Sequence, residues 1–169
     1  MGTTLAALIA TCAPLVHPTT MRALIAVESA GNPYAISINR PLTLAARGVQ
    51  VPVFEQPRTA AQARGLATTL HAAGYTTSIG LAQVNVEHLD AWGLPLELLL
   101  DPCTNLTLAQ RILLDCRDTT NASPSSLPAL LSCFNSGNAT TGIANGYAAR
   151  VHIAALRLTR PSTSRSLTP

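Results

Sequence analysis

Glu28 is the residue whose type and position most clearly offer chemistry. It follows Met21, Leu24 and Ile25 at the spacing of one helix face, so its carboxyl group shares an apolar stripe that should face the core. Burial raises the pKa of a carboxyl group, and the negative end of the helix dipole acts in the same direction. A carboxyl group that stays protonated near neutral pH can serve as a general acid. The local pattern fits an exposed or arginine-paired Glu equally well.

Helical patterns dominate the chain on both sides of this residue. The helix that carries Glu28 should have its N-cap at Thr20 and extend to Ala30, before the stop signal Gly31-Asn32-Pro33. Short alternating segments at 34–39 and 49–54 predict strands of a small sheet, whereas 77–85 has no clear assignment. Further helices are expected at 3–12, 58–73, 86–92, 96–100, from 105 or 107 to 116, from 125 or 126 to 135, and at 143–158.

These elements predict an α+β fold, mostly α, in one domain at 1–158. The polar segment 159–169 has no core to join and is expected to be a disordered tail. Among 169 residues, 47% are apolar and 11% are charged, which suits a chain with a real core. No apolar run approaches the ~18 residues of a membrane-spanning helix.

Several classes of function are not supported by the sequence. The net charge of +3 is compatible with an anionic partner, but the arginines are dispersed and stacking motifs are absent, so no nucleic-acid partner is expected. The sequence has no spacing typical of metal ligands, no P-loop and no Gly-x-Ser-x-Gly. We therefore expect neither a metal nor another cofactor.

The four cysteines are informative about the compartment. An even number without Cys-x-x-Cys spacing favours disulfides and an oxidising environment, with buried free thiols as the alternative. The first 18 residues lack the basic start of a signal peptide, so any leader is expected to have been removed. These features predict an exported protein.

Three segments, in order, resemble the motifs of lytic transglycosylases related to goose-type lysozyme. The first is ESAGNPYAIS at 28–37, the second is IGLAQVN at 79–85, and the third is LLSCFNSGN at 130–138 followed by GYAARV at 146–151. The resemblance covers about residues 3–157. CAPLVHPTT, DPCTN and the long segment between the first two motifs most resemble the specialised members of type IV secretion and conjugation systems.

This resemblance implies a lysozyme-like fold with a small antiparallel sheet and a function in the bacterial cell envelope or periplasm. The implied reaction cleaves the β-1,4 bond between N-acetylmuramic acid and N-acetylglucosamine in peptidoglycan and leaves a 1,6-anhydro sugar. A single Glu, at the position of Glu28, is the acid and then the base. The implied partners are glycan strands and secretion components, and a monomer is expected. The alternatives are a lysozyme-type hydrolase and a weakly active or inactive wall-binding assembly factor.

The motifs also imply substrate-binding positions. By this resemblance Ser37 hydrogen-bonds the catalytic carboxylate, Gln83 lines the glycan groove, the backbone of Ala82 contacts sugar, and Asn135 braces the groove or caps a helix. Tyr147 corresponds to a Tyr near the catalytic Glu. Phe134 stands where the family has a Tyr whose hydroxyl reaches toward that Glu; it keeps the aromatic wall but cannot donate a hydrogen bond.

The remaining acidic residues agree with a one-carboxylate mechanism. Ordinary glycosidases use two carboxylates, whereas substrate-assisted enzymes need one in that role. No other Asp or Glu has a local setting like that of Glu28, although folding could still bring a second one close.

The resemblance further implies a disulfide between Cys12 and Cys103. Cys116 and Cys133 then remain for a second bridge, or are apolar core thiols.

Overall fold

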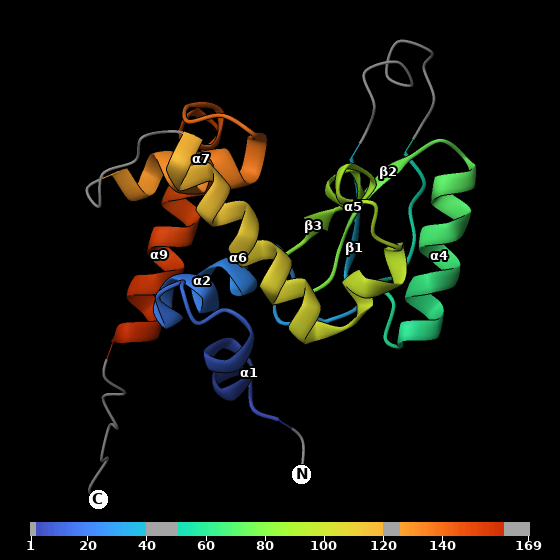
Figure 1. Cartoon of the computed structure of the whole chain (residues 1–169), viewed down its shortest axis with the longest axis horizontal. Coiled ribbons are helices and arrows are strands. Elements are labelled where there is room, and N and C mark those ends of the chain that lie inside the picture. Colours follow the sequence, from blue (N-terminus) through green and yellow to red (C-terminus); the bar gives the residue numbers. More distant parts are fainter. Residues whose placement is uncertain (1–2, 40–50, 120–125, 161–169) are drawn as a thin grey trace, which may run out of the picture.

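Two groups of elements, one helical and one containing the sheet, lie on either side of the long helix α6 (Figure 1). The structure is a computed structural model and describes residues 3–39, 51–119 and 126–160. Within these ranges no helix has the length and hydropathy of a membrane span. The elements are α1 (Leu5–Cys12), α2 (Pro18–Glu28), β1 (Ile36–Asn39), α4 (Ala60–Ala72), β2 (Thr76–Ile79), β3 (Val84–Asn85), α5 (Val86–Trp92), the 3-10 helix η1 (Leu96–Leu100), α6 (Pro102–Thr119), α7 (Leu127–Ser136), α8 (Thr141–Ala144) and α9 (Tyr147–Thr159).

Helix α2 lies in the centre of the helical group and packs against α9 (Figure 1). Its start differs from the prediction: the side chain of His17, and not Thr20, accepts the capping hydrogen bond, and Pro18 is the first helical residue. The helix ends at Glu28, two residues earlier than expected, because Ala30 and Gly31 both have positive φ. Its core-facing residues are fully buried, whereas Arg22 and Ala26 are exposed, so the helix is not buried all round.

The sheet has the antiparallel order β1-β2-β3. The strand predicted at 34–39 is confirmed as β1, but the one at 49–54 is wrong for residues 51–54; residues 49 and 50 lie outside the described ranges. Pro52 has no N–H to contribute to a ladder. Instead the side-chain amide of Gln56 pairs with Ile36, accepting from its N–H and donating to its carbonyl, both at 2.9 Å.

The segment without a sequence assignment, 77–85, contributes to β2 and β3 and the turn between them. Gly80 in this turn has a φ of +86°, a conformation that favours glycine. The buried side chain of Asn105 on α6 supports the turn: it donates to the carbonyls of Ile79 and Leu99 and accepts from the N–H of Ala82. A side chain from another element therefore fixes the hairpin.

Helix α6 and the last expected helix differ from the prediction, and shifts of one or two residues occur at the ends of α1, α4 and α7. Helix α6 begins at Pro102, ahead of the expected Asn105 or Thr107, because the Asp101 side chain accepts the N–H of Thr104 at 2.8 Å. The single helix expected at 143–158 is divided into α8 and α9. Gly146 has a φ of +77° and the Asn145 side chain accepts from the N–H of Tyr147, so a new helix begins there. Of the expected tail, residues 161–169 lie outside the described residues.

The structure contains two disulfides. Cys12–Cys103 connects α1 to α6, and Cys116–Cys133 connects α6 to α7. The four cysteines are therefore not core thiols.

Candidate active site

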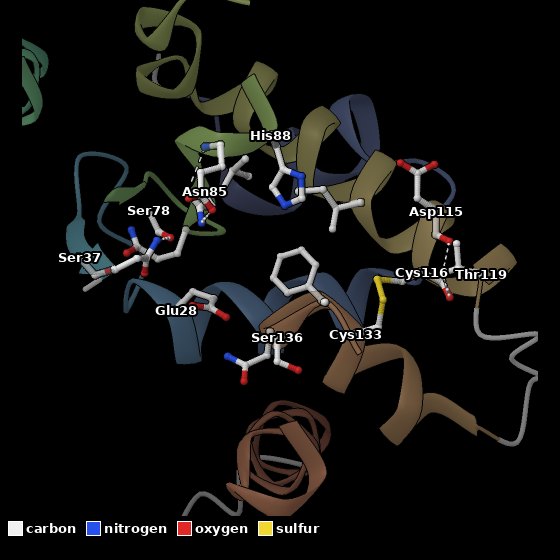
Figure 2. A pocket seen from close by; sticks show the side chains of 18 residues that line it. Glu28, Ser37, Ser78, Asn85, His88, Asp115, Cys116, Thr119, Cys133 and Ser136 are labelled. Carbon is white, nitrogen blue, oxygen red and sulfur yellow. Dashed lines mark hydrogen bonds between the residues drawn. A yellow bond between two sulfur atoms is a disulfide. The ribbon is translucent and has the colours of Figure 1, made fainter. Parts of the chain in front are cut away.

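A cleft of about 670 Å³ lies between the helical group and the sheet. This volume is typical of small-molecule and sugar-sized ligand sites. Figure 2 shows residues of α2, the sheet, α5, α6 and α7 around it. The lining residues are Glu28, Ser37, Asn39, Ser78, Gln83, Val84, Asn85, Glu87, His88, Ile112, Asp115, Cys116, Thr119, Cys133, Phe134, Asn135, Ser136 and Gly137.

Glu28 is half-buried in this cleft, and its carboxyl group accepts a hydrogen bond from the hydroxyl of Tyr147. Burial raises the pKa of Glu28 above its ordinary value, while the Tyr147 hydrogen bond and the positive charge of Arg150 act in the opposite direction. A carboxyl group in this setting can give up a proton and also remain stable as a carboxylate. Both states are needed by a group that is an acid in one step and a base in the next.

Tyr147 does not line the cleft; it is buried at the start of α9 behind Glu28. Its own pKa is raised by burial and by the neighbouring Glu28, so it stays protonated as a donor. Asn145 holds the start of α9: its side chain accepts from the N–H of Tyr147 and donates to the side chain of Asn135 at the cleft. The guanidinium of Arg150 donates to the carbonyl of Asn145. These contacts connect the end of α7 to the partner of Glu28.

Replacing Tyr147 by Phe should move the pH profile of kcat/KM toward higher pH. The hydroxyl donates to the carboxylate and so lowers the pKa of Glu28, whereas burial raises it. Without the hydroxyl the pKa should rise further, and Glu28 should keep its proton to a higher pH. The basic limb of such a profile reports loss of the acid's proton before a substrate binds. Tyr34→Phe, at a tyrosine outside the cleft lining, is the matched control and should leave both limbs in place. An unchanged Tyr147→Phe profile would contradict this role.

The end of α2 is fixed to the sheet side by the residue after Glu28. The hydroxyl of Ser29 donates to the carbonyl of Leu81 at 2.8 Å. Leu81 belongs to the turn that Asn105 supports. Through this contact the position of Glu28 depends on the β2–β3 turn, a connection that the sequence analysis missed.

Four of the positions predicted from the motifs line the cleft. Gln83, Phe134 and Asn135 line the cleft together with Glu28. Ser37 also lines it, but among the described residues it makes no hydrogen bond to the Glu28 carboxyl, whose partner is Tyr147.

Ala82, whose backbone is expected to contact sugar, is not among the residues that line the cleft. Ala82 has 0% exposure, and its N–H is bonded to the side chain of Asn105. The buried Ala82 therefore has a supporting position beneath the cleft.

The donor atoms of Gln83 hold the turn. Its side-chain nitrogen donates to the carbonyls of Ala35 and Gly80, at 2.9 and 3.0 Å. Both amide protons are thus used, and Gln83 can offer a ligand only its side-chain oxygen.

Folding also brings into the cleft titratable residues that no sequence motif indicated. Glu87 and His88 come from α5, and Asp115 from α6. Burial lowers the pKa of His88, against the opposing charges of Glu87 and Asp115. The His88 ring stacks on Trp92, with centroids 5.4 Å apart, and the Arg111 guanidinium lies 4.1 Å above the Trp92 ring. The described residues contain no group of three or more potential ligands that could hold a metal ion.

The comparisons with known proteins agree on one family. The family description "Transglycosylase SLT domain" matches residues 6–156. The chain is 38% identical over 136 residues to "Type IV secretion system protein virB1" of Brucella abortus biovar 1 and of Brucella suis biovar 1, which covers 78% of this chain and 53% of each relative. It is 34% identical over 158 residues to "Protein virB1" of Agrobacterium fabrum, covering 91% of this chain and 60% of the relative. The chain thus spans little more than half the length of these curated relatives. No solved structure matches it.

Proposed function

Because the chain belongs to the transglycosylase SLT domain family, we propose that it is a peptidoglycan lytic transglycosylase that opens the cell wall for a type IV secretion apparatus. The substrate bond is the β-1,4 bond between N-acetylmuramic acid and N-acetylglucosamine. The observation that carries the proposal is Glu28, a half-buried carboxyl group with a raised pKa in a sugar-sized cleft. Names of the relatives support the secretion context, and the two disulfides support an oxidising envelope compartment.

The proposed reaction uses one carboxyl group twice. Protonated Glu28 gives its proton to the glycosidic oxygen, and the bond from that oxygen to C1 of N-acetylmuramic acid breaks. The N-acetyl oxygen of the same sugar stabilises the positive charge at C1. The Glu28 carboxylate then removes the proton of the 6-hydroxyl, whose oxygen bonds to C1 and closes the 1,6-anhydro ring. Glu28 ends the cycle protonated, and no water is consumed.

The surrounding residues have supporting roles in this proposal. The Tyr147 hydroxyl, which donates to Glu28, stabilises the carboxylate between the two proton transfers. Phe134 supplies an apolar wall for a sugar ring, and Ser37, Asn135 and the side-chain oxygen of Gln83 are the proposed polar contacts to the strand.

Mass spectrometry of the released fragments tests the proposal. The full chain is incubated with isolated murein, and we expect muropeptides that end in 1,6-anhydro-N-acetylmuramic acid. Reducing muramic ends would instead identify a lysozyme-type hydrolase.

A wall-binding assembly factor is the second candidate, and Phe134 favours it because the hydroxyl of the family Tyr is missing there. Binding to murein without release of any fragment would support that candidate and contradict the enzyme. A murein-binding assay on the same samples separates it from a protein that has no affinity for the wall.

A further inference from the structure

One of the two disulfides forms part of the cleft wall. Cys116 and Cys133 both line the cleft, and Figure 2 shows their sulfur bridge on the side away from Ser37. Neither Cys12 nor Cys103 lines it. The two bridges therefore differ in their relation to the candidate active site, although both begin or end on α6.

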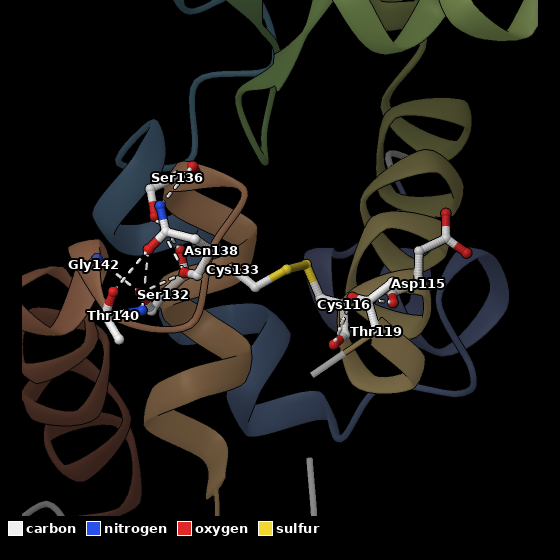
Figure 3. The surroundings of a disulfide bond; sticks show 9 residues. All are labelled: Asp115, Cys116, Thr119, Ser132, Cys133, Ser136, Asn138, Thr140 and Gly142. Atoms are coloured by element: carbon white, nitrogen blue, oxygen red, sulfur yellow. Dashed lines mark hydrogen bonds between the residues drawn. A yellow bond between two sulfur atoms is a disulfide. The ribbon is translucent and has the colours of Figure 1, made fainter. Parts of the chain in front are cut away.

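The bridge joins two helices that supply different parts of the wall. Asp115 and Thr119 lie beside Cys116 on α6, as Figure 3 shows. On α7, Cys133 is followed directly by Phe134 and Asn135, both of which line the cleft. A covalent connection at this point fixes the separation of the α6 and α7 sides.

Helix α7 packs against α6, but the hydrogen bonds of Ser132 and Asn135 lead away from α6 to the α8–α9 segment. The Ser132 hydroxyl donates to the carbonyl of Asn138 and accepts from the N–H of Gly142, both at 2.8 Å (Figure 3). Asn135 accepts from Asn145, which in turn holds the start of α9. Helix α7 is thus hydrogen-bonded to the α8–α9 segment, whereas packing and the disulfide hold it against α6.

We propose that the Cys116–Cys133 disulfide is a positioning element of the glycan cleft, so that tight binding of the glycan strand requires its oxidised form. This inference rests on the proposed function, since it concerns the same substrate. Breaking the bridge removes neither the Glu28–Tyr147 hydrogen bond nor the contact of Asn135 with Asn145, but it releases the α7 wall from its covalent connection to α6. The Michaelis constant should therefore change more than kcat.

The redox step is an ordinary thiol–disulfide exchange. A thiolate of a reducing dithiol attacks one of the two sulfurs, the Cys116–Cys133 bond breaks, and the second thiol of the reagent closes its own disulfide, leaving two protein thiols. An oxidising disulfide, such as that of glutathione, reverses the reaction. A chain that has not left a reducing compartment would accordingly hold its substrate weakly.

The test compares two paired variants, Cys116→Ala with Cys133→Ala and Cys12→Ala with Cys103→Ala. The Cys12–Cys103 bridge spans 91 residues and the other spans 17, so loss of the longer loop should lower Tm more. We expect the opposite order for KM on murein glycan strands: about a tenfold or larger increase without Cys116–Cys133, and little change without Cys12–Cys103. A larger rise in KM in the variant with the smaller loss of Tm is expected only if the Cys116–Cys133 bridge positions the cleft.

Reversible reduction provides a second measurement. In the Cys12→Ala, Cys103→Ala background, dithiothreitol reduces only Cys116–Cys133. KM should rise on reduction and return after reoxidation with glutathione disulfide.

The outcomes that contradict the role of the disulfide differ from the one that contradicts the proposed function. Equal KM values in the two paired variants, or a Cys116/Cys133 variant that is unfolded at the assay temperature, would overturn the inference. A wild-type chain that releases no muropeptides contradicts the proposed function instead. In that case the dissociation constants of the same strands test the positioning role of the disulfide without catalysis. Equal affinities with and without Cys116–Cys133 would overturn the inference.

Discussion

Glu28→Gln should lower the rate of peptidoglycan cleavage by at least ~10²-fold, the usual contribution of a positioned acid–base group. The amide keeps the size of the side chain and an oxygen that can accept the Tyr147 hydroxyl, but it has no acidic proton. Initial rates of anhydromuropeptide release measure the effect. Near-wild-type cleavage by the folded variant would exclude Glu28 as the acid.

The same variant should not be destabilised at neutral pH. Burial raises the pKa of Glu28 in the folded chain, so the unfolded chain loses the proton first as pH rises. Stability is therefore lost between the unfolded and the folded pKa, and an uncharged Gln avoids this loss. A thermal melt at pH 7 should give a Tm equal to or above that of the wild type.

A second carboxylate variant completes this comparison. Glu87 also lines the cleft, but it makes its hydrogen bond with Asn85 at the start of α5. Glu87→Gln should retain most of the activity. A loss as large as that of Glu28→Gln would indicate a two-carboxylate mechanism.

Gly80→Ala in the β2–β3 turn should be strongly destabilising. A Cβ at this position would lie 2.3 Å from the side-chain nitrogen of Asn105 and 2.8 Å from the carbonyl oxygen of Leu99, and φ is +86°. Neither neighbour is free to move, because Asn105 is buried and its three hydrogen bonds join the turn at Ile79 and Ala82 to the Leu99 carbonyl. We expect a loss of about 3 kcal/mol in the free energy of unfolding, or about 10 °C in Tm.

Gly65→Ala is the matched control and should have the opposite sign. Gly65 lies inside helix α4, and a Cβ there meets no atom within 4 Å. Alanine favours the helix by about 0.5–1 kcal/mol over glycine at such a site. If both variants were destabilised equally, contact with Asn105 would not explain the effect at Gly80. Urea unfolding of the two proteins in parallel provides the comparison.

Most helices could be predicted from the sequence because the residues that determine them are close together in the chain. Helix α5 and the 3-10 helix η1 have the predicted bounds, set by the glycine and prolines around them. The lysozyme-like, mostly helical fold with a small sheet is confirmed by the family match and the elements. Prediction was weaker at β2 and β3, which have four and two residues. Their turn depends on Asn105, a side chain 23 positions beyond its partner Ala82.

The same distinction applies to the cleft. The apolar spacing around Glu28 pointed to a perturbed carboxyl group, and the direction of its pKa shift agrees. The partner of that carboxyl group, Tyr147, is 119 positions away, and only the resemblance suggested it. Asp115 and His88 enter the cleft from two other helices, so no local pattern around them could have indicated a shared site.

The pairing of Gln56 with Ile36 has a consequence for the self-association of this protein. A bare outer strand presents backbone groups to which the strand of another molecule can add, the usual beginning of ordered aggregation. Here the side-chain amide of Gln56 already bonds the N–H and the carbonyl of Ile36 in strand β1. Gln56→Ala would expose them, and the protein should then precipitate at lower concentrations than the wild type.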